Sequence, residues 1–232
     1  EHGKPIIYVK NVRKVYRMGD EEVVALKRIN LRIYKGEVCC IFGTSGSGKS
    51  TLLNQLAGME KPTKGQVFIR GKNISDMNEE ELAAFRQEHM SFIFQSYNLL
   101  PSMTAVENVA MPLMFKGMDR KRREAMAEEM LKRVGLSHRL HHYPSQMSGG
   151  QQQRAGIARA FVSRPEVVFA DEPTGNLDTK TTAEIMDMVM GFARRFNQTI
   201  ILVTHDPGMS RYADRIVTLV DGIITGDERK GQ

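Results

Sequence analysis

A glycine-rich loop between an apolar strand and an amphipathic helix places the strongest constraint on what this chain can fold into. The stretch IFGTSGSGKST, residues 41–51, carries the pattern GxxxxGKS after the apolar run 37–42 and before leucines at helical spacing in TLLNQLAG. Glycines let consecutive backbone N–H groups turn inward around phosphate oxygens, and the helix start adds the positive end of its dipole. The order of strand, loop and helix therefore predicts a phosphate-binding site.

Individual positions of this loop have separate expected roles. Lys49 is expected to reach the β- and γ-phosphates of a nucleotide, and Ser50 to offer its hydroxyl to the Mg²⁺ that bridges them. A flexible surface turn is the alternative, and the flanking strand and helix favour nucleotide binding over it. The predicted nucleotide-binding positions here are Gly43, Ser45, Gly46, Ser47, Gly48, Lys49, Ser50 and Thr51.

Strand-like runs alternate with segments of helical periodicity along the chain. The runs that are nearly all apolar are residues 37–42, 91–95, 166–170, 199–203 and 215–220. Such runs are typical of parallel strands covered on both faces. The runs in which polar residues alternate more are residues 6–12, 29–34 and 66–70. Alternation favours antiparallel pairing with one solvated face, so the chain is expected to be an α/β protein with an antiparallel β-subdomain.

The segment from residue 96 to about residue 162 differs from the rest because no convincing strand occurs in it. It contains AVENVAMPLMFKG, the charged stretch MDRKRREAMAEEMLKRVGL and the residues after SGGQ. We interpret it as an all-helical subdomain inserted between residues 1–95 and 163–232 of a single domain.

Length and composition are those of an ordinary globular protein. The chain has 232 residues, a hydrophobic content of 41% and a formal net charge of +6. A positive charge suits anionic partners such as a nucleotide, a nucleic acid or an acidic membrane surface, but it does not define a fold. The two cysteines, Cys39 and Cys40, are adjacent in an apolar strand run, so we expect buried free thiols in a reducing compartment.

The location of the chain is expected to be cytosolic unless a partner carries it elsewhere. No apolar run approaches the roughly 18 residues that span a bilayer. The first ten residues, EHGKPIIYVK, lack the apolar middle of a secretory signal.

Two adjacent acids follow the apolar run 166–170 in the stretch EVVFADEP. Asp171 at the end of a buried strand is placed to hold Mg²⁺ through water, and Glu172 to polarise an attacking water. A strand that simply ends in two solvated acids is the alternative. In combination with the phosphate loop, the pair favours hydrolysis over transfer to a second substrate.

Further motifs resemble those of the ATP-binding cassette (ABC) ATPases of transporters. MSGGQQQR at residues 147–154 resembles the family signature, and it precedes the acidic pair as in that family. Gln95 in FIFQS resembles the Q-loop, Asp178 in GNLD the D-loop, and His205 in LVTHD the H-loop, while Tyr16 resembles the aromatic residue that stacks on adenine. The resemblance covers essentially the whole chain. It implies a P-loop NTPase core with ATP and Mg²⁺ as cofactors.

The resemblance also implies a head-to-tail homodimer. Ser148, Gly149, Gly150 and Gln151 of one subunit would close over an ATP held by Lys49 of the other. From the residues alone, SGGQ is better explained as a helix start capped by Ser148, and the family context reverses this preference in favour of the dimer role.

Several other family roles follow from the same resemblance. Asp178 would reach across the dimer interface, and His205 would hydrogen-bond the γ-phosphate. Gln95 would touch the metal or the attacking water at the hinge into the helical subdomain. The catalytic residues implied are therefore Glu172, His205, Lys49 and Gln95, and the metal-binding residues are Ser50, Gln95 and Asp171.

The resemblance further implies an integral membrane permease as partner, and hence a peripheral location at the cytoplasmic face of the plasma (inner) membrane. The segment SYNLLPSMTAVENVAMPLMFKG is rich in apolar side chains that could pack in a core or line a docking groove for a cytoplasmic helix of that partner. Its candidate groove residues are Leu99, Leu100, Met103, Val106, Met111, Leu113, Met114 and Phe115.

Within the family, TGNLD, MGDEEVVALK and FQSYNLLPSMTAVENV resemble the branch of macrolide-efflux, lipoprotein-release and peptide-resistance ATPases, which favours export or extraction over uptake. Met147 stands where many members have leucine, and Gly175-Asn176 where many have Ser-Ala. The alternative is an ATPase whose membrane partner signals to an extracytoplasmic enzyme and transports nothing; the branch includes such a cell-division member.

Other function classes are disfavoured by the sequence. The basic run 120–123 lies within helical reach of Glu124, Glu128 and Glu129 and is interpreted as a solvated helix, so no nucleic-acid partner is expected. The histidines at 138, 141 and 142 lack neighbouring cysteines and are not expected to bind zinc. No guanine-reading motif of GTPases occurs, and no sustained heptads separate Ser50 from Ser148 as in chromosome-organising ATPases.

Overall fold

The computed structural model describes residues 3–231, which form two compact units. The first unit comprises residues 3–86 together with 199–231, and the second comprises residues 87–198. Each unit has a buried core of its own, and helix α2 (Glu79–His89) carries the chain from the first unit into the second.

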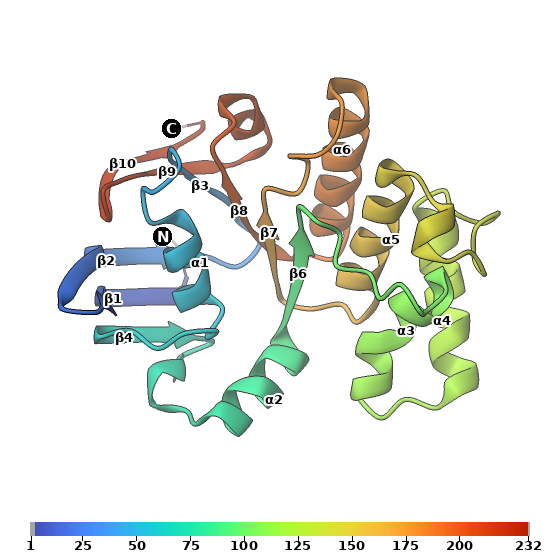
Figure 1. The fold of residues 1–232 in the computed structure, drawn as a ribbon, viewed down its shortest axis with the longest axis horizontal. Helices are drawn as coiled ribbons and strands as arrows, with labels where there is room; N and C mark the ends of the chain where they lie inside the picture. The colour runs from blue at the N-terminus through green and yellow to red at the C-terminus, as the bar shows by residue number, and fades with distance from the viewer. Residues whose placement is uncertain (1–2, 232) are drawn as a thin grey trace. The chain divides into compact units, whose positions relative to one another are not determined.

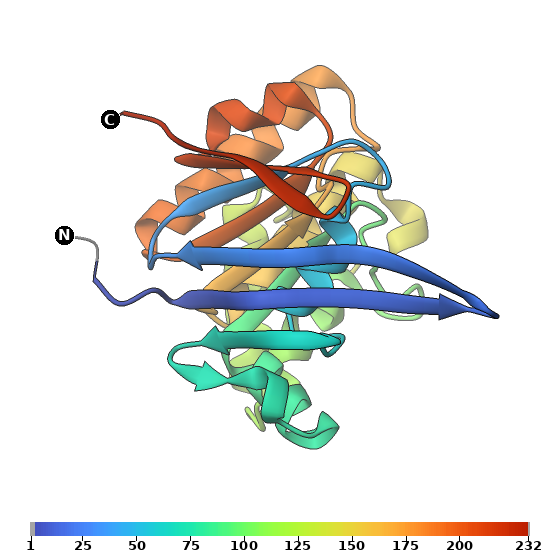
Figure 2. The same cartoon turned by 90° about the vertical axis from the view of Figure 1, so that its left-hand side faces the viewer.

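An antiparallel sheet occupies the N-terminal part of the first unit, with strand order β2-β1-β4-β5. Its strands are β1 (Ile7–Met18), β2 (Glu21–Ile33), β4 (Lys64–Ile69) and β5 (Lys72–Asn73). Strands β1 and β2 form a long hairpin with β4 beside β1 (Figure 2). The buried residues Ile7 and Val9 alternate with more exposed ones, as expected for a sheet with one solvated face.

The remaining strands of the first unit centre on β3, which pairs in parallel with β8 and with β9. They are β3 (Val38–Phe42), β8 (Thr199–Thr204), β9 (Arg215–Val220) and β10 (Ile223–Arg229). Every residue of β8 is buried, and β10 pairs antiparallel with β9. Helix α1 (Lys49–Leu56) follows β3 and contacts β8, and the short helices η1 (Ile74–Asp76) and η3 (Pro207–Tyr212) complete this unit.

The second unit combines a parallel strand pair with a helical group (Figure 1). The strands are β6 (Met90–Phe94) and β7 (Val167–Asp171). The helices are α3 (Ala105–Phe115), α4 (Arg120–Arg133), η2 (Pro144–Gln146), α5 (Gly149–Val162) and α6 (Thr179–Arg195). Helices α3, α4 and α5 contact one another, and α5 also contacts α6. All of residues 96–162 are described, and they contain no strand, as predicted from the sequence.

The predicted α/β character and the division between parallel and antiparallel strands are confirmed. Strands β5 and β10 were missed, because β5 has only two residues and β10 interrupts its apolar alternation with Gly226 and Asp227. Cys39 and Cys40 are buried free thiols on β3, as predicted, and burial raises the pKa of the Cys39 thiol.

A buried arginine links strands of the first unit. The Arg215 guanidinium donates to both carboxylate oxygens of Asp227 at 2.6 and 2.7 Å, and to the backbone oxygen of Arg32 at 2.6 Å. Glu37 lies 3.4 Å from the same side chain. Hydrogen bonds from Arg215 lower the pKa of Asp227 and raise the pKa of Arg215. This bidentate pair joins β9 to β10.

Removal of the Asp227 carboxylate is expected to destabilise the chain. Asp227→Ala should lower the free energy of unfolding by about 2 kcal/mol, a modest value for an ion pair because Asp227 itself is half-exposed. Since the pKa of Asp227 is lowered by folding, its contribution is present above about pH 4 and is lost as pH falls through the folded-state value.

Urea unfolding followed by circular dichroism at neutral and acidic pH measures this effect. The exposed Glu228 on the same strand provides the control, and Glu228→Ala should change the free energy of unfolding by less than about 0.5 kcal/mol. Equal losses in the two variants would contradict the special role of the Arg215–Asp227 pair.

Candidate functional site

The predicted phosphate loop lies between β3 and α1 in the first unit. Gly48, at φ 100°, is the N-cap of α1, and it gives the helix start no side-chain hydrogen bond. The N–H groups of the first helical turn have no partner within the helix, so an uncapped start leaves them for a ligand. The loop thus presents the positive end of α1, with Ser45, Gly46 and Ser50 exposed.

Lys49 is folded back into this loop. Its Nζ donates to the backbone oxygens of Gly43 at 2.6 Å and Thr44 at 2.9 Å, and the residue is only 8% exposed. Ser47 Oγ is also buried and has no hydrogen-bond partner. A buried ammonium and an unpaired hydroxyl inside one turn are groups that a bound anion would satisfy.

Gly43 is required by a close approach of neighbouring atoms. A Cβ built on Gly43 would lie 2.5 Å from the backbone oxygen of Leu219 and 2.5 Å from Ser47 Oγ. Because one of these atoms belongs to the backbone of β9, the loop has no room for even a methyl group at this position.

His205 lies at the same edge of the parallel strands as the phosphate loop. Phe42 of β3 pairs with Thr204 of β8, and the N–H of Gly43 donates to Thr204 O at 3.3 Å. His205 is exposed and follows Thr204 directly. The structure therefore brings together the start of the loop and the predicted H-loop histidine.

Tyr16 lies on β1, and its hydroxyl connects to the region of α1. The hydroxyl donates to Glu60 Oε2 at 2.5 Å, and it is also hydrogen-bonded to Thr51 of α1. Burial and the bond to Glu60 raise the pKa of Tyr16. The half-buried ring has Lys14 Nζ over it, 5.2 Å from its centroid. Tyr16 is thereby tied to the helix that the loop opens.

The second unit brings Gln95 close to the acidic pair. Phe94 of β6 pairs with Asp171 of β7, so Gln95 and Glu172 follow adjacent strand ends. Glu172 has a left-handed backbone with φ 45°, which is uncommon for a residue with a side chain. Such a conformation turns the chain sharply directly after the strand, and local strain of this kind is frequent at functional sites.

Gln95 also makes reciprocal hydrogen bonds with Asn176. Gln95 Nε2 donates to Asn176 Oδ1 at 3.2 Å, and Asn176 Nδ2 donates to the backbone oxygen of Gln95 at 3.1 Å. The predicted Q-loop and the predicted D-loop therefore contact each other within the second unit.

The signature motif opens helix α5. Ser148 is the N-cap, and a capping box joins Ser148 Oγ to the Gln151 N–H and Gln151 Oε1 to the Ser148 N–H. A Cβ on Gly149 would lie 2.7 Å from the hydroxyl of Tyr97, and one on Gly150 would lie 3.1 Å from Thr181 Cγ2. The helix-cap role of Ser148 is thus present, and the N-terminus of α5 keeps its dipole.

Asp178 has a similar structural role as the N-cap of α6. It accepts hydrogen bonds from the N–H and the hydroxyl of Thr181, each at 2.9 Å, and these bonds lower the pKa of Asp178. The side chain is exposed. Its role across an interface stays a prediction.

Two residues without a role predicted from the sequence, Asn176 and Gln153, make hydrogen bonds beside the candidate residues of the second unit. Gln153 of α5 is fully buried, and its Nε2 donates to Phe94 O at 3.0 Å and to Pro173 O. It therefore ties the residue before Gln95 to the residue after Glu172. Residues 151–153 are all glutamine, so the sequence does not distinguish the buried Gln153 from its half-exposed neighbours.

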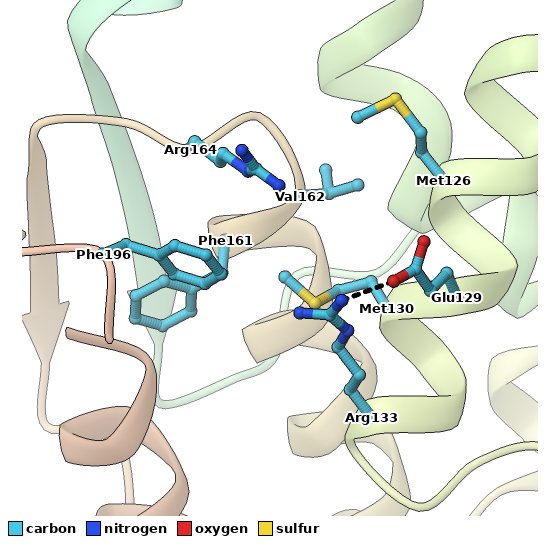
Figure 3. Close-up of a pocket in the computed structure, with 8 residues that line it drawn as sticks. All are labelled: Met126, Glu129, Met130, Arg133, Phe161, Val162, Arg164 and Phe196. Atoms are coloured by element: carbon cyan, nitrogen blue, oxygen red, sulfur yellow. Dashed lines mark hydrogen bonds and ion pairs between the residues drawn. The ribbon is translucent and has the colours of Figure 1, made fainter. Parts of the chain in front are cut away.

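A separate hollow in the second unit lies beside α4 and the end of α5 (Figure 3). It is lined by Met126, Glu129, Met130, Arg133, Phe161, Val162, Arg164 and Phe196. Its volume of about 50 Å³ is far below the several hundred Å³ of sites for small molecules. Arg164 lies over the Phe196 ring, 5.3 Å from its centroid, so this hollow is better explained as side-chain packing.

The groups described fit ATP and Mg²⁺. The loop around Lys49 offers N–H groups, an ammonium and the unpaired Ser47 hydroxyl, which suit phosphate. In the first unit Ser50 carries a hydroxyl oxygen, and in the second unit Gln95 and Asp171 carry amide and carboxylate oxygens; oxygen is the ligand atom that Mg²⁺ prefers. Bound Mg²⁺ would neutralise charge on the phosphates.

A glycine-rich loop between a parallel strand and a helix, together with acids at the end of another parallel strand, defines a P-loop nucleotide hydrolase. The family model described as ABC transporter matches residues 26–175. The chain belongs to this family, and it is an ATPase with ATP and Mg²⁺ as cofactors.

Similar proteins support this assignment. An uncharacterised ABC transporter ATP-binding protein of Methanocaldococcus jannaschii is 48% identical over 94% of this chain and 97% of its own length. A macrolide export ATP-binding/permease protein, MacB, of Shewanella sp. strain ANA-3 is 47% identical over 97% of this chain, which spans only 34% of that protein.

A solved dimeric ATP-binding cassette in a post-hydrolysis state, bound to ADP and Pi, has the same fold. Its TM-score is 0.90 at 42% identity, and the match covers 97% of this chain and 99% of that one. The P-loop core, the antiparallel β-subdomain and the helical subdomain expected from the sequence are thereby confirmed.

Filling the space at Gly43 is expected to weaken ATP binding. Gly43→Ala would force its methyl group into Leu219 O and Ser47 Oγ and so distort the loop, which should weaken ATP binding by at least about tenfold, or about 1.4 kcal/mol. Isothermal titration calorimetry with ATP and Mg²⁺ measures the affinity.

Gly191 in α6 provides the matched control, since a Cβ there would meet no atom within 4 Å. Gly191→Ala should leave the ATP affinity unchanged. Unchanged affinity in Gly43→Ala would show that the tight contact does not shape the nucleotide site.

Proposed function

We propose that two copies of this chain form a head-to-tail dimer around two Mg²⁺-ATP and drive export through a membrane permease. The observation that carries this proposal is the opening of α5. Ser148, Gly149 and Gly150 form an accessible helix N-terminus in addition to the phosphate loop at α1. One chain has no need of two sites for a γ-phosphate, so the second is best used by a partner's ATP.

The dimeric cassette with ADP and Pi supports this arrangement, because it is similar to this chain over nearly the full length of both. In the proposed dimer, Asp178 and the α5 start face the second subunit. The capping box at Ser148 does not conflict with this role, since it uses the N–H groups of Ser148 and Gln151 and leaves those of Gly149 and Gly150 outside the box, and the dipole remains.

We further propose a separate role for each candidate residue in ATP hydrolysis. Lys49 binds the β- and γ-phosphates, and Ser50, Asp171 and Gln95 hold Mg²⁺ directly or through water. Glu172 accepts the proton of the attacking water, while His205 hydrogen-bonds the γ-phosphate. Adenine stacks against Tyr16.

A membrane partner is supported by the MacB relatives, which combine an ATP-binding part of this kind with a permease. We therefore propose that the chain acts at the cytoplasmic face of the membrane with a permease partner. Export is favoured over uptake because these relatives are named for macrolide export.

A surface suited to such a partner lies between α3 and α4. A cavity of about 240 Å³ there is lined by three methionines, Ala110 and four charged residues: Met103, Met111, Met114, Ala110, Glu107, Arg120, Arg123 and Glu124. Flexible methionine side chains suit an adaptable groove for a helix.

The structure sorts the candidate groove residues into three groups. Leu99, Met103 and Met111 are half-buried. Val106 and Leu113 are buried in the core and cannot line a docking surface. Leu100, Met114 and Phe115 are exposed, and Phe115 is the most exposed of them at 61%. The docking proposal therefore rests on the exposed group and the methionine-lined cavity.

The dimer is tested by the solution mass of Glu172→Gln, measured by light scattering behind a sizing column. The amide keeps contacts to phosphate and removes the base, so a closed dimer should accumulate with Mg²⁺ and ATP and disappear without nucleotide. A protein that binds ATP and remains monomeric would contradict the ATP-driven homodimer.

A second pair of variants locates the interface. Adding Ser148→Arg to Glu172→Gln should prevent dimerisation and leave ATP binding intact, because its bulk would block the proposed surface of α5. Adding Ser145→Arg instead, at an exposed position just before η2 ends, should permit dimerisation. Loss of the dimer in both variants would indicate a charge effect without a specific role for Ser148.

A further inference from the structure

Gln95 is hydrogen-bonded to Asn176 through both its side chain and its backbone, within the second unit. Its Nε2 donates to Asn176 Oδ1, and its backbone oxygen accepts from Asn176 Nδ2. Turning the Gln95 amide by 180° would place its acceptor Oε1 against the acceptor Asn176 Oδ1. Turning the Asn176 amide would place Nδ2 against Gln95 Nε2, and Oδ1 against the Gln95 backbone oxygen, so the observed orientation of both amides is fixed.

This orientation matters because the two ends of a carboxamide differ chemically. Only the oxygen of an amide can bind a hard cation, whereas the nitrogen can only donate hydrogen bonds. Asn176 Oδ1 occupies the nitrogen end of the Gln95 amide. The Oε1 end is thereby the one left to face a metal.

Gly175 is needed for the same arrangement. A Cβ on Gly175 would lie 2.6 Å from Gln95 Nε2 and 2.9 Å from Gln95 Cδ. Gly175 does not have a positive φ, so its backbone conformation does not require glycine. What requires glycine here is the space that the Gln95 amide occupies.

The backbone around this pair is also fixed. Buried Gln153 Nε2 donates to Phe94 O and Pro173 O, and the Gly175 N–H donates to Glu172 O at 3.1 Å. The turn that carries Asn176 is therefore tied to the strand ends that carry Gln95 and Glu172.

We propose that Asn176 is a positioning residue that orients the Gln95 carboxamide so that Oε1 binds Mg²⁺. This inference rests on the role of Gln95 in the proposed function. Asn176 itself does not touch the metal; it acts through Gln95, and Gly175 supplies the space.

The test measures how much Mg²⁺ is needed for nucleotide binding, with no turnover involved. A fluorescent ATP analogue is bound to the Glu172→Gln protein at increasing Mg²⁺ concentration, and the half-saturating Mg²⁺ concentration is determined. Asn176→Ala should raise this concentration by about tenfold, the size of effect seen when a residue that orients a metal ligand is lost. Gly175→Ala should raise it similarly with Asn176 intact.

A double-mutant cycle separates positioning from a general structural effect. Gln95→Ala should raise the half-saturating Mg²⁺ concentration at least as much as Asn176→Ala, and Asn176→Ala should add nothing further in the Gln95→Ala background. Exposed Thr179→Ala is the matched control and should leave the Mg²⁺ requirement unchanged. Circular dichroism unfolding confirms that the variants remain folded.

The outcomes distinguish the inference from the function on which it rests. If Gln95→Ala raises the Mg²⁺ requirement but Asn176→Ala and Gly175→Ala do not, the role of Asn176 is overturned and that of Gln95 stands. If Gln95→Ala has no effect, the metal role of Gln95 fails and the inference fails with it. An additive effect of Asn176→Ala on Gln95→Ala would also overturn the inference.

Discussion

The parallel pairing of strands is the constraint that brings the candidate residues together within each unit. Parallel strands end at a common edge, so residues that directly follow paired ends become neighbours. Phe42 with Thr204 brings the phosphate loop to His205, and Phe94 with Asp171 brings Gln95 to Glu172. Pairing of these strands also satisfies backbone N–H and C=O groups that would otherwise be buried without partners.

Three helix starts in this chain show how the same backbone feature is adapted to different tasks. Helix α1 begins at a glycine that provides no side-chain cap, so its first N–H groups remain for phosphate. Helices α5 and α6 begin at Ser148 and Asp178, whose side chains each satisfy one N–H group. A helix start whose N–H groups are capped by a side chain is stable without a ligand, whereas a helix start without such a cap gains more stability when an anion binds its free N–H groups. This difference is consistent with α1 as the principal phosphate site and α5 as a site completed by a second subunit.

Much of the fold could be predicted from the sequence because it rests on local pattern. Apolar runs marked β3, β6, β7, β8 and β9, and glycines at fixed spacing marked the loop before Lys49. Contacts between distant residues carry no such pattern. No sequence pattern shows that the Gln95 side chain donates to Asn176, or that Gln153 reaches Pro173. Gly175-Asn176 departs from the common pattern of the family, but only the structure shows which residues these two positions contact.

Gly175 and Asn176 also illustrate how two adjacent residues can act together on one side chain, that of Gln95. A side chain at 175 would displace the Gln95 amide, so the hydrogen bonds to Asn176 require glycine beside it. Without Asn176, Gly175 would leave an open space in which the Gln95 side chain could rotate. Binding of a metal would then have to fix this side chain, at a cost in rotamer entropy. With Asn176 present, part of that ordering takes place during folding. A ligand group ordered before the metal arrives binds it at a lower entropic cost, which is the general advantage of preorganisation.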